Sequence, residues 1–178
     1  MEGFSMKDRE TNRLRIWTHL LPALLWMLVI YLMSSQPYDK QSLKPWLQKH
    51  VNEQAVKNRF GSVQFRYGAS EVSIDAKGSA GFIEFFIRKG AHVAEYGVLG
   101  MLVIRWLASV WKSDIPKLML FALLICAAYA GLDEFHQSFT SNRTPMALDA
   151  LLDAAGAAAG IIFFSHFARW GSKRGVPA

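Results

Sequence analysis

The chain has 178 residues, of which 52% are hydrophobic and 19% charged, and its formal net charge is +6. This length suits a single domain, 1–178. The only cysteine, Cys126, excludes a disulfide framework and a cysteine-based zinc finger, and the glycine-rich phosphate loop, H-E-x-x-H and G-x-S-x-G motifs are missing. Because the basic residues flank apolar blocks and form no stripe, the composition favours a membrane protein and argues against a nucleic-acid partner.

The first apolar block covers residues 16–33 and has the length of a transmembrane helix, which needs roughly 20 apolar residues. A cleaved signal peptide is the alternative. The block ends in Leu-Met-Ser-Ser-Gln-Pro without a small-residue cleavage site, and acidic residues occur in the segment before it. We therefore expect a retained anchor, preceded by a tail at 1–15.

A long polar loop follows at 36–81 and shows two local patterns. Apolar residues at rough helical spacing predict a helix over 44–60. Alternating apolar residues at 63–67 and 72–74, on either side of a turn at 68–70, predict a β-hairpin. We expect a small, partly ordered cap outside the membrane.

Further apolar blocks predict transmembrane helices at 83–108, 117–135 and 147–168, before a tail at 169–178. In the last block Gly156 and Gly160 form a G-x-x-x-G pattern, which predicts close packing against another helix. The predicted fold class is an all-α membrane protein, a four-transmembrane-helix bundle with a partly ordered external loop between helices 1 and 2.

Basic residues at the span ends predict the orientation. They cluster before the first span, between the second and third, and after the fourth. By the positive-inside rule these regions are cytoplasmic, so we expect both termini inside and the loop at 36–81 outside. That loop carries seven basic residues, but long loops translocate largely regardless of charge.

This topology brings ionisable residues from four segments to the same external end. Charges that face lipid are costly, so their helix faces should point into the bundle and mark a functional site. Helical spacing places Lys89, His92 and Tyr96 on one face, and Asp149 and Asp153 on another. The remaining candidates are Ser34, Ser35, Gln36, Arg88, Glu95, Asp133, Glu134, His136, Gln137 and Arg143.

A purely structural role is the alternative for each of these residues. Long basic side chains at span ends usually reach back to the interface, and we favour that role for Arg88, Arg105 and Lys117. Arg88 adjoins the cluster and stays among the candidates for substrate binding. For the dense cluster we favour a working site, since scaffolding could use less costly residues.

The same residues carry a resemblance to a known family. The runs Arg88-Lys89-Gly-Ala-His92-Val-Ala-Glu95-Tyr96 and Asp133-Glu134-Phe-His136-Gln137, followed by Arg143, Asp149 and Asp153, resemble the VanZ-like family of small bacterial membrane proteins. Ser34-Ser35-Gln36 is similar to that family's first motif, whereas the loop at 36–81 is a departure, because family members often have a shorter connection there. The resemblance implies a multi-pass protein of the bacterial plasma membrane. The family's namesake confers low-level teicoplanin resistance, so glycopeptide resistance is an expectation here.

Three mechanisms are compatible with the cluster. In the first, it binds or modifies an envelope lipid, such as a lipid-linked cell-wall precursor, at the outer leaflet. Lys89, His92 and Arg143 would contact a phosphate. The charge balance resists a simple anion pocket, so either some carboxylates are protonated or a cation joins them. The basic residues are Arg88, Lys89 and Arg143, and the acidic ones are Glu95, Asp133, Glu134, Asp149 and Asp153.

In the second mechanism the protein is an intramembrane hydrolase or transferase. Its metal ligands would come from His92, Glu95, Asp133, His136 and Asp149, whose nitrogen and oxygen atoms suit zinc or manganese. Their spacing matches no known ligand motif, so neither a metal nor another cofactor is assigned. Without a metal, a histidine paired with a carboxylate could act as a general acid or base. The catalytic candidates are then His92, Glu95, Asp133, Glu134 and His136.

The third mechanism is a proton-coupled carrier that uses the acids and histidines as a relay. The predicted cytoplasmic half is mostly apolar, so this mechanism ranks last. We prefer the first, in which membrane lipids are the partners. The substrate-binding residues would be Ser34, Ser35, Gln36, Arg88, Lys89, Tyr96, Gln137, Arg143, Asp149 and Asp153.

Overall fold

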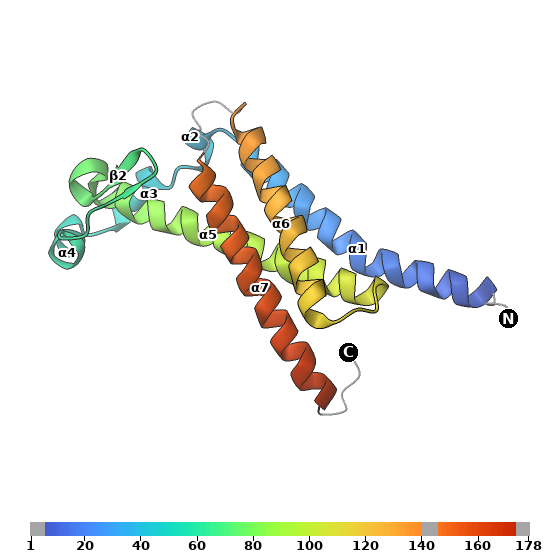
Figure 1. Ribbon diagram of the computed structural model, residues 1–178. Coiled ribbons are helices and arrows are strands. Elements are labelled where there is room, and N and C mark those ends of the chain that lie inside the picture. The colour runs from blue at the N-terminus through green and yellow to red at the C-terminus, as the bar shows by residue number, and fades with distance from the viewer. Residues whose placement is uncertain (1–5, 140–145, 174–178) are drawn as a thin grey trace.

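Figure 1 shows the computed structural model, which describes residues 6–139 and 146–173, with side chains at 14, 16–139 and 146–167. Long helices cross one another, and a small cap (residues 35–73) lies at one end of α5. The first residues of α1 and the last of α7 lie at the end away from the cap. The long helices are α1 (Met6–Ser34), α5 (Ile74–Val110), α6 (Ile115–Gln137) and α7 (Ala147–Lys173).

Four of the described helices are long and apolar enough to cross a membrane. Their outward faces carry large apolar side chains, among them Leu25 on α1, Leu124 on α6 and Ile162 on α7, each more than half exposed. In lipid a helix satisfies its own backbone hydrogen bonds, so such faces are stable there. The protein is an all-α four-helix membrane bundle, as predicted from the sequence. The apolar segments are Ile16–Ser34, Ile74–Val110, Ile115–Gln137 and Ala147–Phe167.

The second long helix begins earlier than the predicted span at 83–108. Ser73 caps it, because its side-chain oxygen accepts a hydrogen bond from the backbone N–H of Ala76 over 3.1 Å. The helix then bends at Gly78, whose φ of 69° favours glycine. The connection between α1 and α5 therefore ends at Ser73, and residues 74–81 belong to the helix.

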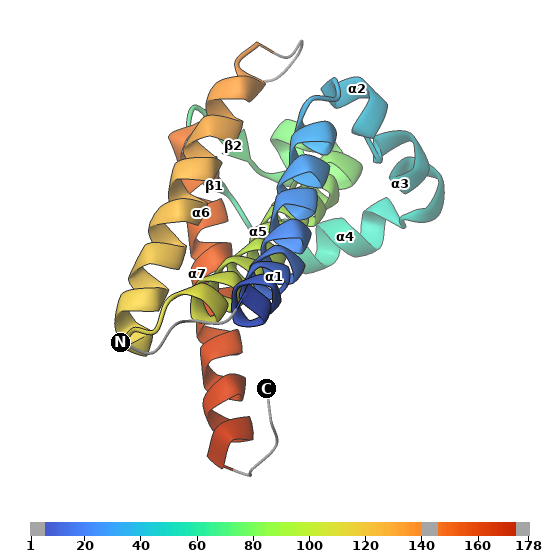
Figure 2. The same ribbon diagram turned by 90° about the vertical axis from the view of Figure 1, so that its right-hand side faces the viewer.

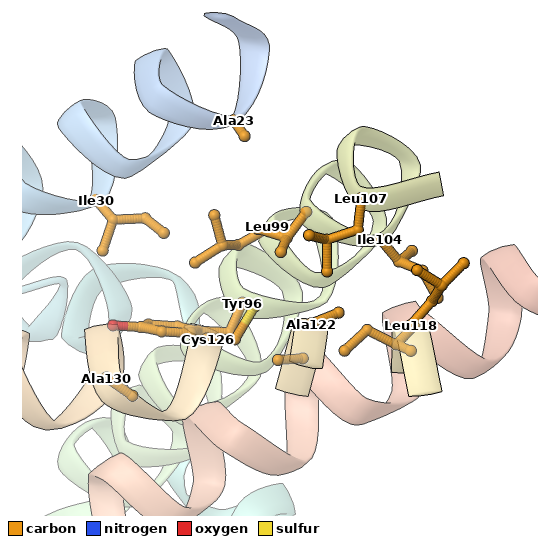
Figure 3. Close-up of a cluster of buried hydrophobic side chains, with 13 residues drawn as sticks. Ala23, Ile30, Tyr96, Leu99, Ile104, Leu107, Leu118, Ala122, Cys126 and Ala130 are labelled. Atoms are coloured by element: carbon orange, nitrogen blue, oxygen red, sulfur yellow. The ribbon is translucent and has the colours of Figure 1, made fainter. Parts of the chain in front are cut away.

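The core of the bundle is built around α5 (Figure 3). Tyr96 and Leu99 of α5 are fully buried against Cys126 of α6 and, on the other side, residues of α1 such as Ile30. α5 packs most extensively on α7, and the glycine pattern explains how closely. A Cβ atom on Gly156 would lie 2.6 Å from the carbonyl oxygen of Val93. The prediction of tight helix packing at G-x-x-x-G is confirmed.

The cap contains short helices and one hairpin, and in Figure 2 its helices lie on one side of α1 while α6 lies on the other. The prediction of a single helix over 44–60 is wrong, because the backbone is extended at Val51, which ends one helix, and at Asn52, which caps the next by accepting from the N–H of Ala55. The hairpin is confirmed, but Ile74 belongs to α5 and not to a strand. The elements are α2 (Tyr38–Gln41), α3 (Lys44–His50), α4 (Glu53–Phe60), β1 (Phe65–Tyr67) and β2 (Ser70–Val72).

Candidate functional site

The polar candidates gather at the end of the bundle next to the cap, which we call the cap end. There α1 and α6 finish, α7 begins, and α5 emerges from the cap. The prediction that the acidic faces point inward is confirmed for Asp133, Glu134 and Asp153, which are all less than a tenth exposed. Burial of several carboxylates in one region requires polar partners.

The first partner set joins α5, α7 and the cap. Lys89 Nζ lies 2.5 Å from Asp149 Oδ1, and the hydroxyl of Tyr67 donates to the same oxygen over 2.6 Å. The ring of Tyr67 also lies under Lys89, with the ammonium 4.6 Å from its centroid. Burial and the nearby carboxylate of Asp149 raise the pKa of Tyr67, so its hydroxyl remains a donor at neutral pH. The hairpin is thereby tied to the bundle.

One helical turn deeper, a second pair joins the same two helices. His92 Nδ1 lies 3.3 Å from Asp153 Oδ1, and Asp153 is only 1% exposed. Both atoms lack a well-directed hydrogen bond among the described residues, so this contact is not an aligned hydrogen bond; it is an ion pair when His92 is protonated. Lys89 and His92 lie about one turn apart on α5, as do Asp149 and Asp153 on α7. Because α5 and α7 pack side by side, the two residues of α5 each face one acid of α7.

Asp133 has a different environment from the acids of α7. Its Oδ1 accepts from the hydroxyl of Ser34 over 2.6 Å, and its Oδ2 accepts from Gln137 Nε2 over 3.0 Å. The last residue of α1 is thus joined to the last two turns of α6. Neutral donors satisfy this buried carboxylate, and no ion pair with a described basic residue is formed.

The remaining predicted residues are spread over the cap end. Glu134 accepts a hydrogen bond from the backbone N–H of Met146, while the ring of His136 packs on Tyr31 with centroids 4.6 Å apart. Tyr96 lies in the apolar core (Figure 3). Ser35, directly after α1, donates to the backbone carbonyl of Tyr31 in that helix. The other predicted residues are Gln36 and Glu95, which line a cavity described below, and Arg143, which lies outside the described residues.

The cap and the first turns of α5 contribute residues that sequence reasoning missed. Glu84, only 1% exposed, accepts from the hydroxyl of Tyr38 over 2.8 Å and from the N–H of Leu43 over 2.6 Å. The guanidinium of Arg88 lies over the Tyr38 ring, 4.5 Å from its centroid. A lone carboxylate inside the apolar run 81–86 was the available signal, since such a group needs partners when buried. The sequence around Tyr38 and Tyr67 has no comparable feature that would have identified them as site residues.

Two cavities open at the cap end. The basic cavity measures about 330 Å³, and four basic and two acidic side chains line it. The apolar cavity measures about 440 Å³ and lies between α1, α5, α6 and the cap. Most of its wall area is apolar, and its polar lining includes His92, Glu95 and Asp133. Arg88 lines both, so the cavities are adjacent at this residue. The charged residues of the basic cavity are Lys44, Lys77, Arg88, Lys89, Glu84 and Asp149.

The predicted metal ligands do not gather into one group. Within residues 6–139 and 146–173, no three His, Cys, Asp or Glu side chains are placed to hold a metal ion together. His92 faces Asp153, whereas His136 packs on an aromatic ring of α1.

Comparison with protein families adds a separate line of evidence to this geometry. The family model described as VanZ/LLP1 matches residues 19–169. The chain belongs to the VanZ-like family. Neither the curated proteins nor the solved structures give a match to this VanZ-like protein. The matched range includes the cap, the last three apolar segments and the first segment from residue 19 onward, so the family match extends over both the helices and the cap.

Proposed function

We propose that this VanZ-like membrane protein acts on the bacterial cell envelope, where it binds or modifies a lipid-linked or headgroup substrate at the outer leaflet. The observation that carries the proposal is the convergence of buried polar side chains at the cap end. Three separate carboxylates, Asp133, Asp149 and Asp153, are each held there by partners from another element or turn. Maintaining such groups at the end of a membrane bundle is costly without a use.

The proposed location follows from the topology and from the distribution of charge. Four apolar helices place both ends of the described chain on the side away from the cap. The positive-inside rule then supports cytoplasmic termini in the plasma membrane and a cap outside it. The proposed partners are membrane lipids, among them a lipid-linked cell-wall precursor. We also propose that the protein confers teicoplanin resistance, which the family's namesake supports.

Lipid retained by the protein during purification tests the binding proposal. The wild type is extracted from membranes in mild detergent, and its bound lipids are compared with those of Asp133→Asn. The control is Asp114→Asn, because Asp114 is exposed and pairs with Lys117 at the opposite end of the bundle. We expect the wild type and the control to retain the same enriched lipid and Asp133→Asn to lose it. Equal lipid profiles in all three proteins would contradict the proposal.

Drug susceptibility of a bacterial host tests the proposed teicoplanin resistance. A sensitive Gram-positive host expresses the wild type, Asp133→Asn or Arg143→Ala at matched membrane levels and is exposed to teicoplanin or vancomycin. We expect the wild type to protect selectively against teicoplanin and both variants to lose that protection. If the wild type gives no protection, glycopeptide resistance does not apply to this member.

No contact within the described residues favours the metal-assisted enzyme or the proton-coupled carrier over this proposal. Both therefore remain predictions from the sequence.

A further inference from the structure

We infer that the two cavities form one binding site for an anionic amphiphile, with a terminal phosphate of more than one negative charge in the basic cavity and a hydrocarbon chain in the apolar cavity. This inference rests on the proposed function and names the chemical class of its substrate. Each cavity falls within the size range of ligand pockets.

The basic cavity has positive charge that the protein does not neutralise. Of its two acids, Asp149 is paired with Lys89 and hydrogen-bonded by Tyr67. The other acid, Glu84, accepts from a tyrosine hydroxyl and a backbone N–H. No ion pair among the described residues includes the three remaining cations of this cavity, Lys44, Lys77 and Arg88.

An aromatic ring holds two of these cations where an anion can reach them. Tyr38 lies with its ring centroid 4.5 Å from the Arg88 guanidinium and 5.6 Å from the Lys44 ammonium. Its hydroxyl is fixed by Glu84, so the ring is anchored to α5. A ring can orient a cation without neutralising it, which leaves the N–H donors of Arg88 available. Arginine and lysine in such an arrangement favour phosphate.

The surplus charge predicts the charge of the ligand. A phosphodiester headgroup carries one negative charge, whereas a terminal phosphate monoester carries about −1.5 to −2 at neutral pH. Over the whole lining, four basic and two acidic side chains leave a surplus of two positive charges, which matches a terminal phosphate better than a diester. A zwitterionic headgroup would bring a positive charge of its own and fit worst.

The second cavity explains why the ligand should be an amphiphile. Its apolar wall comes from Ile30 and Met33 of α1 and from Ile87 and Ala91 of α5. Polar side chains, Arg88 among them, line the rest. Met33 is 46% exposed and Ile87 is 43% exposed, so the rim opens between two membrane-spanning segments. Apolar walls at this level suit a hydrocarbon chain that enters from the bilayer, while the phosphate remains with the cations.

Lipid binding to the purified full chain tests the inference. Phosphatidate, phosphatidylglycerol and phosphatidylcholine with identical chains are titrated against the protein in detergent and followed by native mass spectrometry. We expect phosphatidate to bind about tenfold more tightly than phosphatidylglycerol, and phosphatidylcholine to bind weakest. Arg88→Gln and Lys77→Gln should each weaken phosphatidate binding by about tenfold or more. The matched control is Arg105→Gln, on the same helix but at the opposite end, which should leave it unchanged.

A comparison of lipids with long and short acyl chains tests the two cavities separately. Ala91→Phe places a ring in the apolar cavity, so it should weaken binding of dioleoyl phosphatidate and leave dihexanoyl phosphatidate unchanged. Inorganic phosphate should compete only weakly, because it lacks the chain. Unchanged gel-filtration and thermal-unfolding profiles verify that each variant is folded.

Three results would overturn the inference. They are equal binding of phosphatidate and phosphatidylcholine, equal effects of Arg88→Gln, Lys77→Gln and Arg105→Gln, and competition by inorganic phosphate at the affinity of the long-chain lipid. If Asp133→Asn still abolishes selective lipid retention while phosphatidate and phosphatidylglycerol bind alike, the proposed function stands and the inferred headgroup charge is wrong.

Discussion

The substitution Gly156→Ala tests whether the contact between α5 and α7 holds the site together. The added Cβ would lie 2.6 Å from the carbonyl oxygen of Val93 and 2.9 Å from its Cα. Real Cβ contacts essentially never fall below 3.0 Å, and both atoms belong to backbone, so no side-chain rotation relieves the clash. α7 must therefore move away from α5. Overpacking of this kind costs about 1–3 kcal/mol, and we expect a loss near the upper end.

The matched control is Gly131→Ala on α6, where an added Cβ would meet nothing within 4 Å. Alanine is the better helix former by about 1 kcal/mol, so this variant should be unchanged or slightly more stable. The free energy of unfolding is measured by titrating SDS into detergent micelles and following circular dichroism. Equal stability of Gly156→Ala and wild type, or an equal loss in Gly131→Ala, would refute the packing argument.

Three further predictions concern the cap and the start of α5. Tyr67→Phe removes the hydroxyl that donates to Asp149, so we expect the free energy of unfolding to fall by about 1.5–3 kcal/mol in the same SDS titration. An unchanged free energy of unfolding would contradict the hydrogen bond. Glu84→Ala removes the acceptor that holds the cap to α5, and hydrogen exchange should become faster in residues 38–50 but not in α6. Gly78→Ala forces a φ of 69° and a ψ of 164° on a residue with a Cβ and should lower the free energy of unfolding by about 1–3 kcal/mol. Gly90→Ala, in open space, should cost nothing measurable.

The helical parts of this protein follow from local features of the sequence. Apolar blocks of sufficient length predict the four spans, because a helix is the simplest way to satisfy the backbone in lipid. Helical periodicity also places Lys89 beside His92, and Asp149 beside Asp153, without any knowledge of the fold. The boundaries were less predictable. The start of α5 depends on Ser73, whose capping hydrogen bond no apolar pattern could reveal.

The tertiary structure decided which side chains meet. Close packing on glycine backbones aligns α5 with α7, so Lys89 contacts Asp149 and His92 contacts Asp153. Asp133 instead accepts hydrogen bonds from Ser34 and Gln137. Many of the key contacts join residues far apart in the chain, as between Tyr67 and Asp149. Local sequence determines which face of a helix is polar. The partner of that face depends on how closely and at what height the helices pack, which is a property of the whole fold.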